Sequence, residues 1–224
     1  IISGFFGKLI GDRNSEIVTS LMVTISAIFS AIVLYNVIFN QYQDNILIAT
    51  WISSGTLDVN WSMKIDPLSA IMLVVVTSVS SLVHIYSIGY MSHDPHKPRF
   101  MAYLSLFTFA MLTLVTSDNF LQLFFGWEGV GLCSYFLIGF WFKKKSANTA
   151  AIKAFIVNRI GDFGLLLALF SIFIVFGTLN INEIKVLVNS QNDSFFQFLG
   201  FEVHTLTLIS MLLFVGCMGK SAQF

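Results

Sequence analysis

The sequence alternates between long apolar runs and short segments that hold most of its charged residues. A membrane-spanning helix needs about 20 mostly apolar residues to cross about 30 Å of hydrocarbon. Six runs come close to this length or exceed it, and residues 1–10 have the composition of the end of another helix. The six expected spans are residues 17–40, 66–91, 100–117, 119–142, 150–177 and 202–224.

These spans are expected to be helices in an all-α, polytopic transmembrane bundle that forms one domain over residues 1–224. A transmembrane β-barrel would show segments of about ten residues in alternation, and the sequence has none. The Ser and Thr residues scattered through the runs suit helices that pack on other helices. Because the chain starts at Ile1 and stops at Phe224 within an apolar run, we expect a piece of a longer polypeptide.

The composition excludes most other classes of protein. Hydrophobic residues make up 56% of the 224 residues and charged residues only 11%, whereas a soluble domain carries roughly 25% charged residues. A net charge of zero argues against a nucleic-acid-binding protein, and 2 Cys residues argue against a disulfide-rich one. An integral membrane protein remains.

The charges of the connecting segments predict the orientation. Every second connection is basic, with eight Lys and Arg residues in segments 8–16, 92–99 and 143–153. The three connections between them hold only Lys64 and Lys185. Since short basic loops stay on the side from which helices are inserted, the basic connections are expected in the cytosol or the mitochondrial matrix.

Two longer connections on the opposite side are expected to carry small elements. Residues 41–65 contain Trp51, Gly55 and Trp61 among polar residues, which is compatible with a hairpin at the membrane interface. Residues 178–201 are polar and rich in Asn, and we expect a short amphipathic helix there.

Ionisable residues inside the spans are the candidate functional residues. Each costs roughly 2.5–3.5 kcal/mol on insertion scales, so its presence needs a reason. Glu128 lies about 13–14 Å into its span, and Lys220 lies deep in the last apolar run. Arg159 and Asp162 are three residues apart on one helix face, where they could simply neutralise each other.

Glu128 and Lys220 are each alone on their spans, so we expect them to pair across helices. Burial disfavours the charged form of both groups and pairing favours it, so a buried pair can gain or lose a proton when its partner moves. Glycines near both residues permit close helix contact or a break in a helix, as in ion-transport sites, although tight packing alone would explain any one of them.

The remaining titratable residues give weaker signals. His204 at a span edge is a weak candidate for proton entry, while His84 within a span is more typical of a packing histidine. Cys133 and Cys217 lack metal-ligand spacing and are expected in the core, so the sequence indicates no metal site.

Four motifs carry a resemblance to a known family. They are Asp66-Pro-Leu-Ser69, Gly126-Trp-Glu-Gly-Val-Gly-Leu-Cys-Ser-Tyr135, Asn158-Arg-Ile-Gly-Asp-Phe-Gly164 and Gly219-Lys-Ser-Ala-Gln223. In this order they resemble subunit 5 of respiratory complex I, the proton-pumping NADH:ubiquinone oxidoreductase. The similarity runs from about residue 3 to Phe224 and corresponds to the N-terminal part of this antiporter-like subunit.

The resemblance implies roles for the buried charges. Glu128 and Lys220 match the glutamate and the lysine of the family's first half-channel, with Lys220 on a broken helix, and Arg159 and Asp162 match its supporting charge pair. The family's second half-channel and long lateral helix would follow Phe224.

The resemblance also implies a setting. NADH, FMN, iron–sulfur clusters and ubiquinone would bind elsewhere in the complex, and this chain would hold no cofactor. Its partners would be membrane lipids and other complex I membrane subunits, especially the neighbouring antiporter-like subunit, with no nucleic acid. The abundance of Phe and Ile, together with the resemblance, favours the mitochondrial inner membrane over a bacterial plasma membrane.

The sequence leaves two alternatives open. The chain could be a subunit of a multisubunit sodium/proton antiporter without a redox partner. It could also be a structural subunit of the membrane arm, in which the buried charges only fix the packing of the helices.

Overall fold

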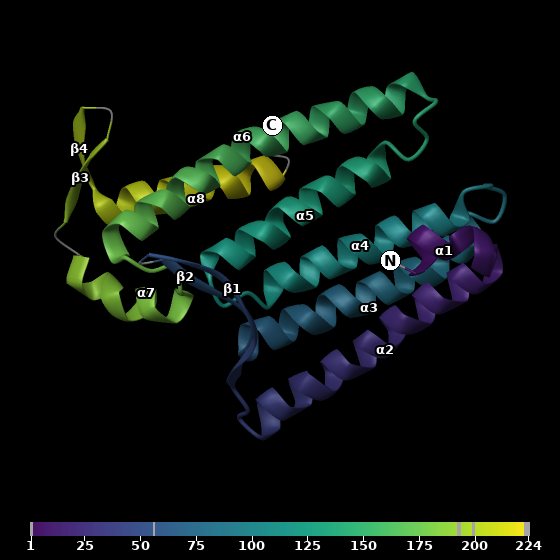
Figure 1. Cartoon of the computed structure of the whole chain (residues 1–224), viewed down its shortest axis with the longest axis horizontal. Helices are drawn as coiled ribbons and strands as arrows, with labels where there is room; N and C mark the ends of the chain where they lie inside the picture. Colours follow the sequence, from purple (N-terminus) through teal and green to yellow (C-terminus); the bar gives the residue numbers. More distant parts are fainter. Residues whose placement is uncertain (1, 56, 192–193, 199, 222–224) are drawn as a thin grey trace.

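Long helices that run side by side dominate the computed structural model, which describes residues 2–55, 57–191, 194–198 and 200–221 (Figure 1). The helices are α1 (Ile2–Ile10), α2 (Asp12–Phe39), α3 (Pro67–Tyr90), α4 (Lys97–Val115), α5 (Phe120–Ile138), α6 (Lys145–Phe176), α7 (Ile181–Leu187) and α8 (Thr205–Lys220). Among the described residues, five helices, α2 to α6, are long and apolar enough to cross a membrane, and α8 is a shorter apolar helix. The expected class, an all-α polytopic bundle, is confirmed.

The expected spans overlap α2 to α6 and α8, but some ends differ. Helix α2 begins at Asp12 and α6 at Lys145, each five residues before the expected span. The reason is that a helix can extend beyond the hydrocarbon with polar first turns, which hydropathy alone does not detect. Helix α8 ends at Lys220, and residues 222–224, on which a continuation of the expected broken helix depends, lie outside the described residues.

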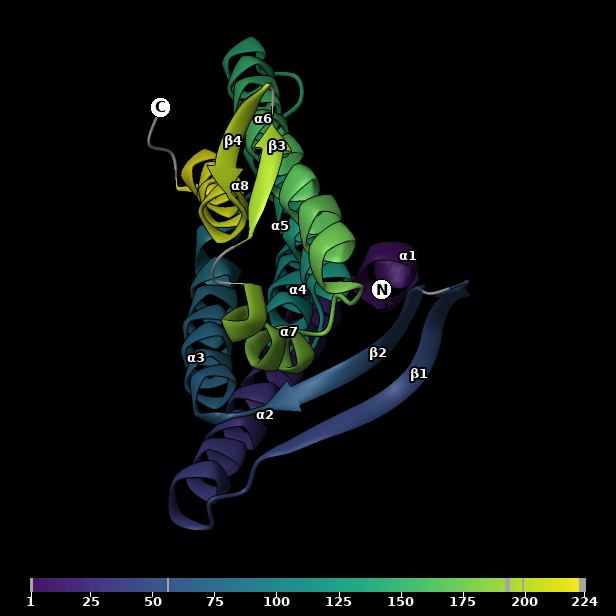
Figure 2. The same ribbon diagram turned by 90° about the vertical axis from the view of Figure 1, so that its left-hand side faces the viewer.

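The helices pack largely in chain order. Helix α2 contacts α3, α3 contacts α4, α4 contacts α5, α5 contacts α6, and α6 contacts α8. Helix α1 lies against α2 and α4 (Figures 1 and 2). Helix α6 therefore contacts both α5 and α8, which matters for the buried charges.

The two ends of the bundle differ. The basic connections α3–α4 and α5–α6 and the start of α2 lie together at one end, on the right in Figure 1. The opposite end carries an antiparallel hairpin of β1 (Asp44–Ser54) and β2 (Leu57–Ile65), which confirms the hairpin expected over residues 41–65. Helix α7 confirms the short helix expected over residues 178–201.

A second hairpin precedes α8 and was not expected from the sequence. Strands β3 (Phe195–Phe198) and β4 (Phe201–His204) pair antiparallel, after a short 3₁₀ turn over Val188–Gln191. Strands this short leave too little period-two alternation to be detected in a polar segment.

Glycines bring neighbouring helices into backbone contact. A Cβ atom on Gly126 of α5 would lie 2.6 Å from the backbone nitrogen of Leu114 in α4. In the same way, a Cβ atom on Gly219 of α8 would lie 2.9 Å from the Cα atom of Gly161 in α6. These contacts hold the α4–α5 and α6–α8 pairs at distances that no other residue allows, and membrane helices commonly associate in this way.

The Asp66-Pro-Leu-Ser69 motif forms the N-terminal cap of α3. The Asp66 carboxylate accepts a hydrogen bond from the Ser69 N–H at 2.8 Å, and the Asp66 N–H donates to the Ser69 hydroxyl at 2.8 Å. Pro67 occupies the first helical position, where no N–H is needed. Burial raises the pKa of the Asp66 carboxyl, but the Ser69 hydrogen bonds and Lys64 lower it by more, so the group is ionised at neutral pH and accepts these bonds.

We expect Gly126→Ala to lower the stability of the protein by about 1–3 kcal/mol, because its new methyl group would press on the backbone of α4. Gly89→Ala in α3 is the matched control, since no atom lies within 4 Å of a Cβ atom there. The measurement is the thermal unfolding midpoint of the purified complex in detergent. Equal midpoints for the two variants would contradict the close contact.

We expect Asp66→Ala to destabilise the start of α3 by about 0.5–2 kcal/mol, because an alanine cannot accept the cap hydrogen bond. Asp66→Asn should keep most of that stability, since asparagine is also a good cap residue. Hydrogen exchange of the first turn of α3 measures the effect. If the first turn of α3 exchanged its amide hydrogens equally fast in the Asp66→Asn and Asp66→Ala variants, the side-chain cap would not be what stabilises this turn.

Candidate functional site

Four ionisable side chains from three helices gather where α5, α6 and α8 meet. Glu128 comes from α5, Arg159 and Asp162 come from α6, and Lys220 is the last residue of α8. We call these four residues the charge cluster. Two are acidic and two are basic, so the cluster has no net charge when all four are ionised.

The cluster is a chain of ion pairs in which positive and negative groups alternate. The Nη1 atom of Arg159 pairs closely with Oε2 of Glu128 and lies 3.9 Å from Oδ2 of Asp162. The Nζ atom of Lys220 lies 3.9 Å from the other oxygen of Asp162, Oδ1. The order is therefore Glu128, Arg159, Asp162, Lys220.

The expected direct pair between Glu128 and Lys220 is wrong, because each of these residues pairs with a residue of α6 instead. Among the described residues, no ion pair within 4.0 Å joins these two side chains. The physical reason is the order of the helices: α6 lies against both α5 and α8, and its two charges at positions i and i+3 face both neighbours. Arg159 and Asp162 thus do more than neutralise each other, because each also pairs with a residue on another helix.

Burial varies along the cluster. The Asp162 side chain is 5% exposed and the Lys220 side chain 16%, whereas the Arg159 side chain is 46% exposed. Within the described part of the chain, Oε1 of Glu128 and Nζ of Lys220 are buried without a hydrogen-bond partner. A buried polar atom without a hydrogen bond is costly, so these two atoms are the least satisfied points of the network.

Trp127 supports the cluster and was not identified as a candidate from the sequence. Its Nε1–H donates to Oδ1 of Asp162 at 2.7 Å, and its ring lies 5.5 Å from Nζ of Lys220. A Cβ atom on Gly131 would lie 2.5 Å from the same Nζ, so this glycine leaves the space that the lysine head occupies. The position of Trp127 directly before Glu128 was the only signal in the sequence.

The weaker candidates lie elsewhere. His204 precedes α8 and packs against the Phe195 ring at 5.8 Å, about 24 Å along the helix from Lys220. His84 is fully buried between α3 and α4, where Nδ1 lies 2.8 Å from the Ser80 carbonyl oxygen and Nε2 lies 3.2 Å from the Ser105 hydroxyl. This is the packing role that the sequence favoured.

The two cysteines lie in different surroundings. Cys133 is buried, as expected, but Cys217 is exposed on α8, so the expectation that both lie in the core is wrong for Cys217. The apolar run around it shows the depth of this residue in the membrane but not the face of α8 on which it lies. Over the part of the chain that is described, no group of three or more His, Cys, Asp or Glu residues could hold a metal ion.

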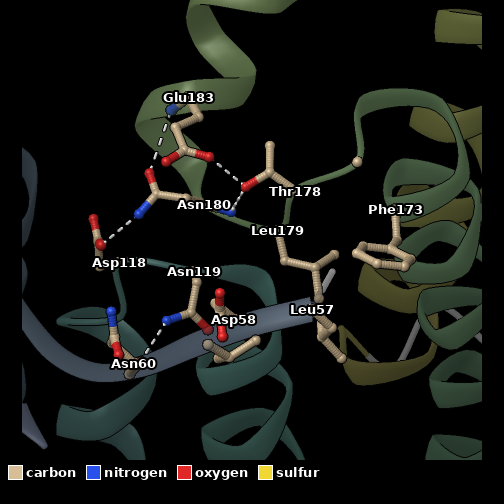
Figure 3. A pocket seen from close by; sticks show the side chains of 12 residues that line it. Leu57, Asp58, Asn60, Asp118, Asn119, Phe173, Thr178, Leu179, Asn180 and Glu183 are labelled. Atoms are coloured by element: carbon tan, nitrogen blue, oxygen red, sulfur yellow. Dashed lines mark hydrogen bonds between the residues drawn. The ribbon is translucent and has the colours of Figure 1, made fainter. Parts of the chain in front are cut away.

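A polar pocket of about 290 Å³ lies at the end of the bundle that carries the hairpins (Figure 3). Asp118 accepts hydrogen bonds from the side-chain amides of Asn180 and Asn182 at 2.7 and 3.4 Å. Asn119 donates to the Asn60 carbonyl oxygen of β2 at 2.9 Å. These hydrogen bonds join β2, the start of α5 and the start of α7. The polar residues around the pocket therefore hold the connecting segments in place.

Comparisons with known proteins show what this arrangement resembles. Residues 51–101 match the family described as NADH-Ubiquinone oxidoreductase (complex I), chain 5 N-terminus. Residues 117–224 match the family described as NADH:quinone oxidoreductase/Mrp antiporter, TM. The second match contains the whole charge cluster.

Curated relatives agree with these matches. The chain is 52% identical over 223 residues to NADH-ubiquinone oxidoreductase chain 5 of Chondrus crispus, covering 100% of this chain and 34% of that protein. It is 50% identical over 222 residues to chain 5 of Triticum aestivum, covering 99% and 33%. It is 48% identical over 223 residues to NADH-quinone oxidoreductase subunit L of Rickettsia bellii, covering 100% and 35%. The chain thus spans about a third of the length of these relatives.

Solved structures share the fold. One is the Mrp complex from Dietzia sp. DQ12-45-1b, with a TM-score of 0.78 and 23% identity over 99% of this chain and 22% of that chain. Another is the membrane-bound sulfane sulfur reductase, an archaeal respiratory membrane complex, with a TM-score of 0.78 and 17% identity over 97% and 42%. The expectation of an antiporter-like bundle is therefore confirmed, and the chain belongs to the family of complex I chain 5 and its antiporter-like relatives.

Proposed function

We propose that this chain provides part of a proton path in a respiratory complex I, with the charge cluster as its relay. The observation that carries the proposal is the unbroken chain of ion pairs from Glu128 to Lys220 across α5, α6 and α8. Intramembrane ionisable residues that face a bundle interior and pair with one another commonly mark proton relays.

Arg159 gives the cluster two arrangements. It touches both carboxylates, closely at Glu128 and at 3.9 Å from Asp162. When Glu128 takes up a proton it loses its charge, so Arg159 is released to pair fully with Asp162. Asp162 then attracts Lys220 less, and the ammonium group gives up one proton. One proton enters at Glu128 and one leaves at Lys220, and the reverse order of steps moves a proton the other way.

The energy for this exchange would come from outside the chain. In the proposed assembly, NADH oxidation and ubiquinone reduction take place in other subunits, which hold the FMN and the iron–sulfur clusters. This chain would carry out no redox chemistry and would bind no cofactor. It would form part of an enzyme only as one subunit of the proton-pumping NADH:ubiquinone oxidoreductase.

The membrane setting follows from the family and the helices. Five membrane-length helices among the described residues support a multi-pass membrane protein, and relatives from an alga and from plants favour the mitochondrial inner membrane. Other membrane subunits of the same complex are its expected partners. The adjacent antiporter-like subunit would be the closest of them, and lipids would cover the apolar outer face.

A sodium/proton antiporter subunit is the second candidate, favoured by the match of residues 117–224 to the family described as NADH:quinone oxidoreductase/Mrp antiporter, TM. The two functions differ in their partners and in the ion that is exchanged. Co-purification with flavin and iron–sulfur subunits supports the complex I assignment. Proton movement driven by a sodium gradient without NADH would support the antiporter instead.

We expect Glu128→Gln to lower NADH-driven proton pumping in proteoliposomes by about half or more, because glutamine keeps the shape of the side chain but cannot take up a proton. Glu202→Gln is the matched control, since Glu202 is an exposed acid in β4 and lies outside the charge cluster. Proton movement is measured with a pH-sensitive dye alongside NADH oxidation. If Glu128→Gln pumped as fast as Glu202→Gln, Glu128 would not be part of the relay.

We expect the effects of Asp162→Asn and Lys220→Gln on stability to be coupled in a double-mutant cycle. Removing the carboxylate alone leaves Lys220 as a buried charge without its close partner, a loss that typically costs about 3–5 kcal/mol. Replacing both residues should cost less than the sum of the single replacements. The unfolding midpoints of the four purified complexes give the coupling, and strictly additive values would mean that the two groups do not interact.

A further inference from the structure

A second pocket lies at the basic end of the bundle, away from the charge cluster. It has a volume of about 220 Å³ and lies between the start of α4, the end of α5 and the start of α6. Arg99 and Tyr103 line it from α4, and Tyr135, Phe136 and Asn148 are among the residues that line it from α5 and α6.

Arg99 is the charged residue of this pocket, and its hydrogen bonds are incomplete. Its Nη2 donates to the Phe140 carbonyl oxygen at 3.2 Å, and its guanidinium group lies 4.6 Å from the centre of the Phe140 ring and 5.4 Å from that of Phe142. In the described part of the chain, its Nε is buried without a hydrogen-bond partner. An arginine close to two aromatic rings and with an Nε that lacks a partner is suited to an anion, because the planar guanidinium binds phosphate with paired hydrogen bonds.

The charge around the pocket has one dominant sign. No acidic side chain lines it among the described residues, and Lys143, Lys144 and Lys145 follow directly after the pocket residue Phe142. The nearby Asp94 accepts a hydrogen bond from Trp141 Nε1 at 2.9 Å and also attracts Arg99, so one carboxylate partly offsets this positive charge. Helix α6 starts at Lys145 with no side chain bonded to its first N–H groups and no acidic residue in its first turn, which adds positive potential.

The walls of the pocket suit a lipid better than a free ion. The Tyr103 and Phe136 rings stack at 5.2 Å, and Tyr135 contacts Phe155 at 5.4 Å. Aromatic residues at the ends of membrane helices lie at the level of the lipid headgroups. A basic pocket between helices on the matrix or cytoplasmic side is the kind of site that binds anionic headgroups.

We infer that this pocket binds the phosphate group of an anionic phospholipid, with Arg99 as its principal ligand and Asn148 and the lysines of residues 143–145 around it. The aromatic side chains would surround the glycerol and the start of the acyl chains. The site is separate from the proposed proton path, so it does not depend on that proposal.

The test uses the purified complex in nanodiscs of phosphatidylcholine, titrated with phosphatidylglycerol and followed by native mass spectrometry. We expect Arg99→Gln to lower the affinity for one bound phosphatidylglycerol by about tenfold or more, since a charge-assisted pair is lost. Asn148→Asp is a second variant that keeps Arg99 and adds a negative charge, and an acid in the first turn of α6 is compatible with the helix. This variant should also lower the affinity for the same lipid.

The control is Lys153→Gln, which removes a basic residue from the same end of the bundle without touching the pocket. It should bind phosphatidylglycerol as the unaltered complex does. Unchanged binding in both Arg99→Gln and Asn148→Asp would overturn the site. Displacement of the lipid by millimolar inorganic phosphate would overturn the lipid assignment, because the pocket would then recognise free phosphate.

Discussion

The position of two opposite charges on α6, facing two different neighbours, is the constraint on which the site depends. In the membrane interior an isolated charge is costly, so Glu128 on α5 and Lys220 on α8 each require a partner. Arg159 and Asp162 supply these partners from one helix, and they lie close enough to interact with each other. Moving α6 away from α5 and α8 would leave Glu128 and Lys220 without these partners, while Arg159 and Asp162 would keep only each other.

The packing of the bundle serves this arrangement. Apolar membrane helices have little hydrophobic drive to associate, so close backbone contacts and buried polar groups must hold them together. The glycines at the α6–α8 contact bring the two backbones together near Lys220. Gly131 on α5 leaves space for the ammonium group, and Trp127 fixes Asp162 by a hydrogen bond. The same side chains thus stabilise the fold and position the charge cluster.

Much of the architecture could be predicted from the sequence because it depends on length and composition. Apolar runs of membrane length fall on helices, and the alternating basic connections fall at one end of the bundle. Glu128, Arg159, Asp162 and Lys220 could be identified because charges are rare in such runs. Their pairing could not be predicted, since it depends on which helices are neighbours. The roles of Trp127 and Arg99 also depend on contacts between helices, and one sequence does not contain that information.

The central claim is that the charge of Glu128 is coupled to that of Lys220 through α6. Infrared difference spectroscopy of the carboxyl groups during NADH-driven turnover tests it most directly, with Glu128→Gln used to assign the Glu128 band. We predict that replacing Lys220 by methionine shifts or abolishes the band for protonation of Glu128. A Glu128 band with the same position and size in the Lys220→Met variant would contradict the account.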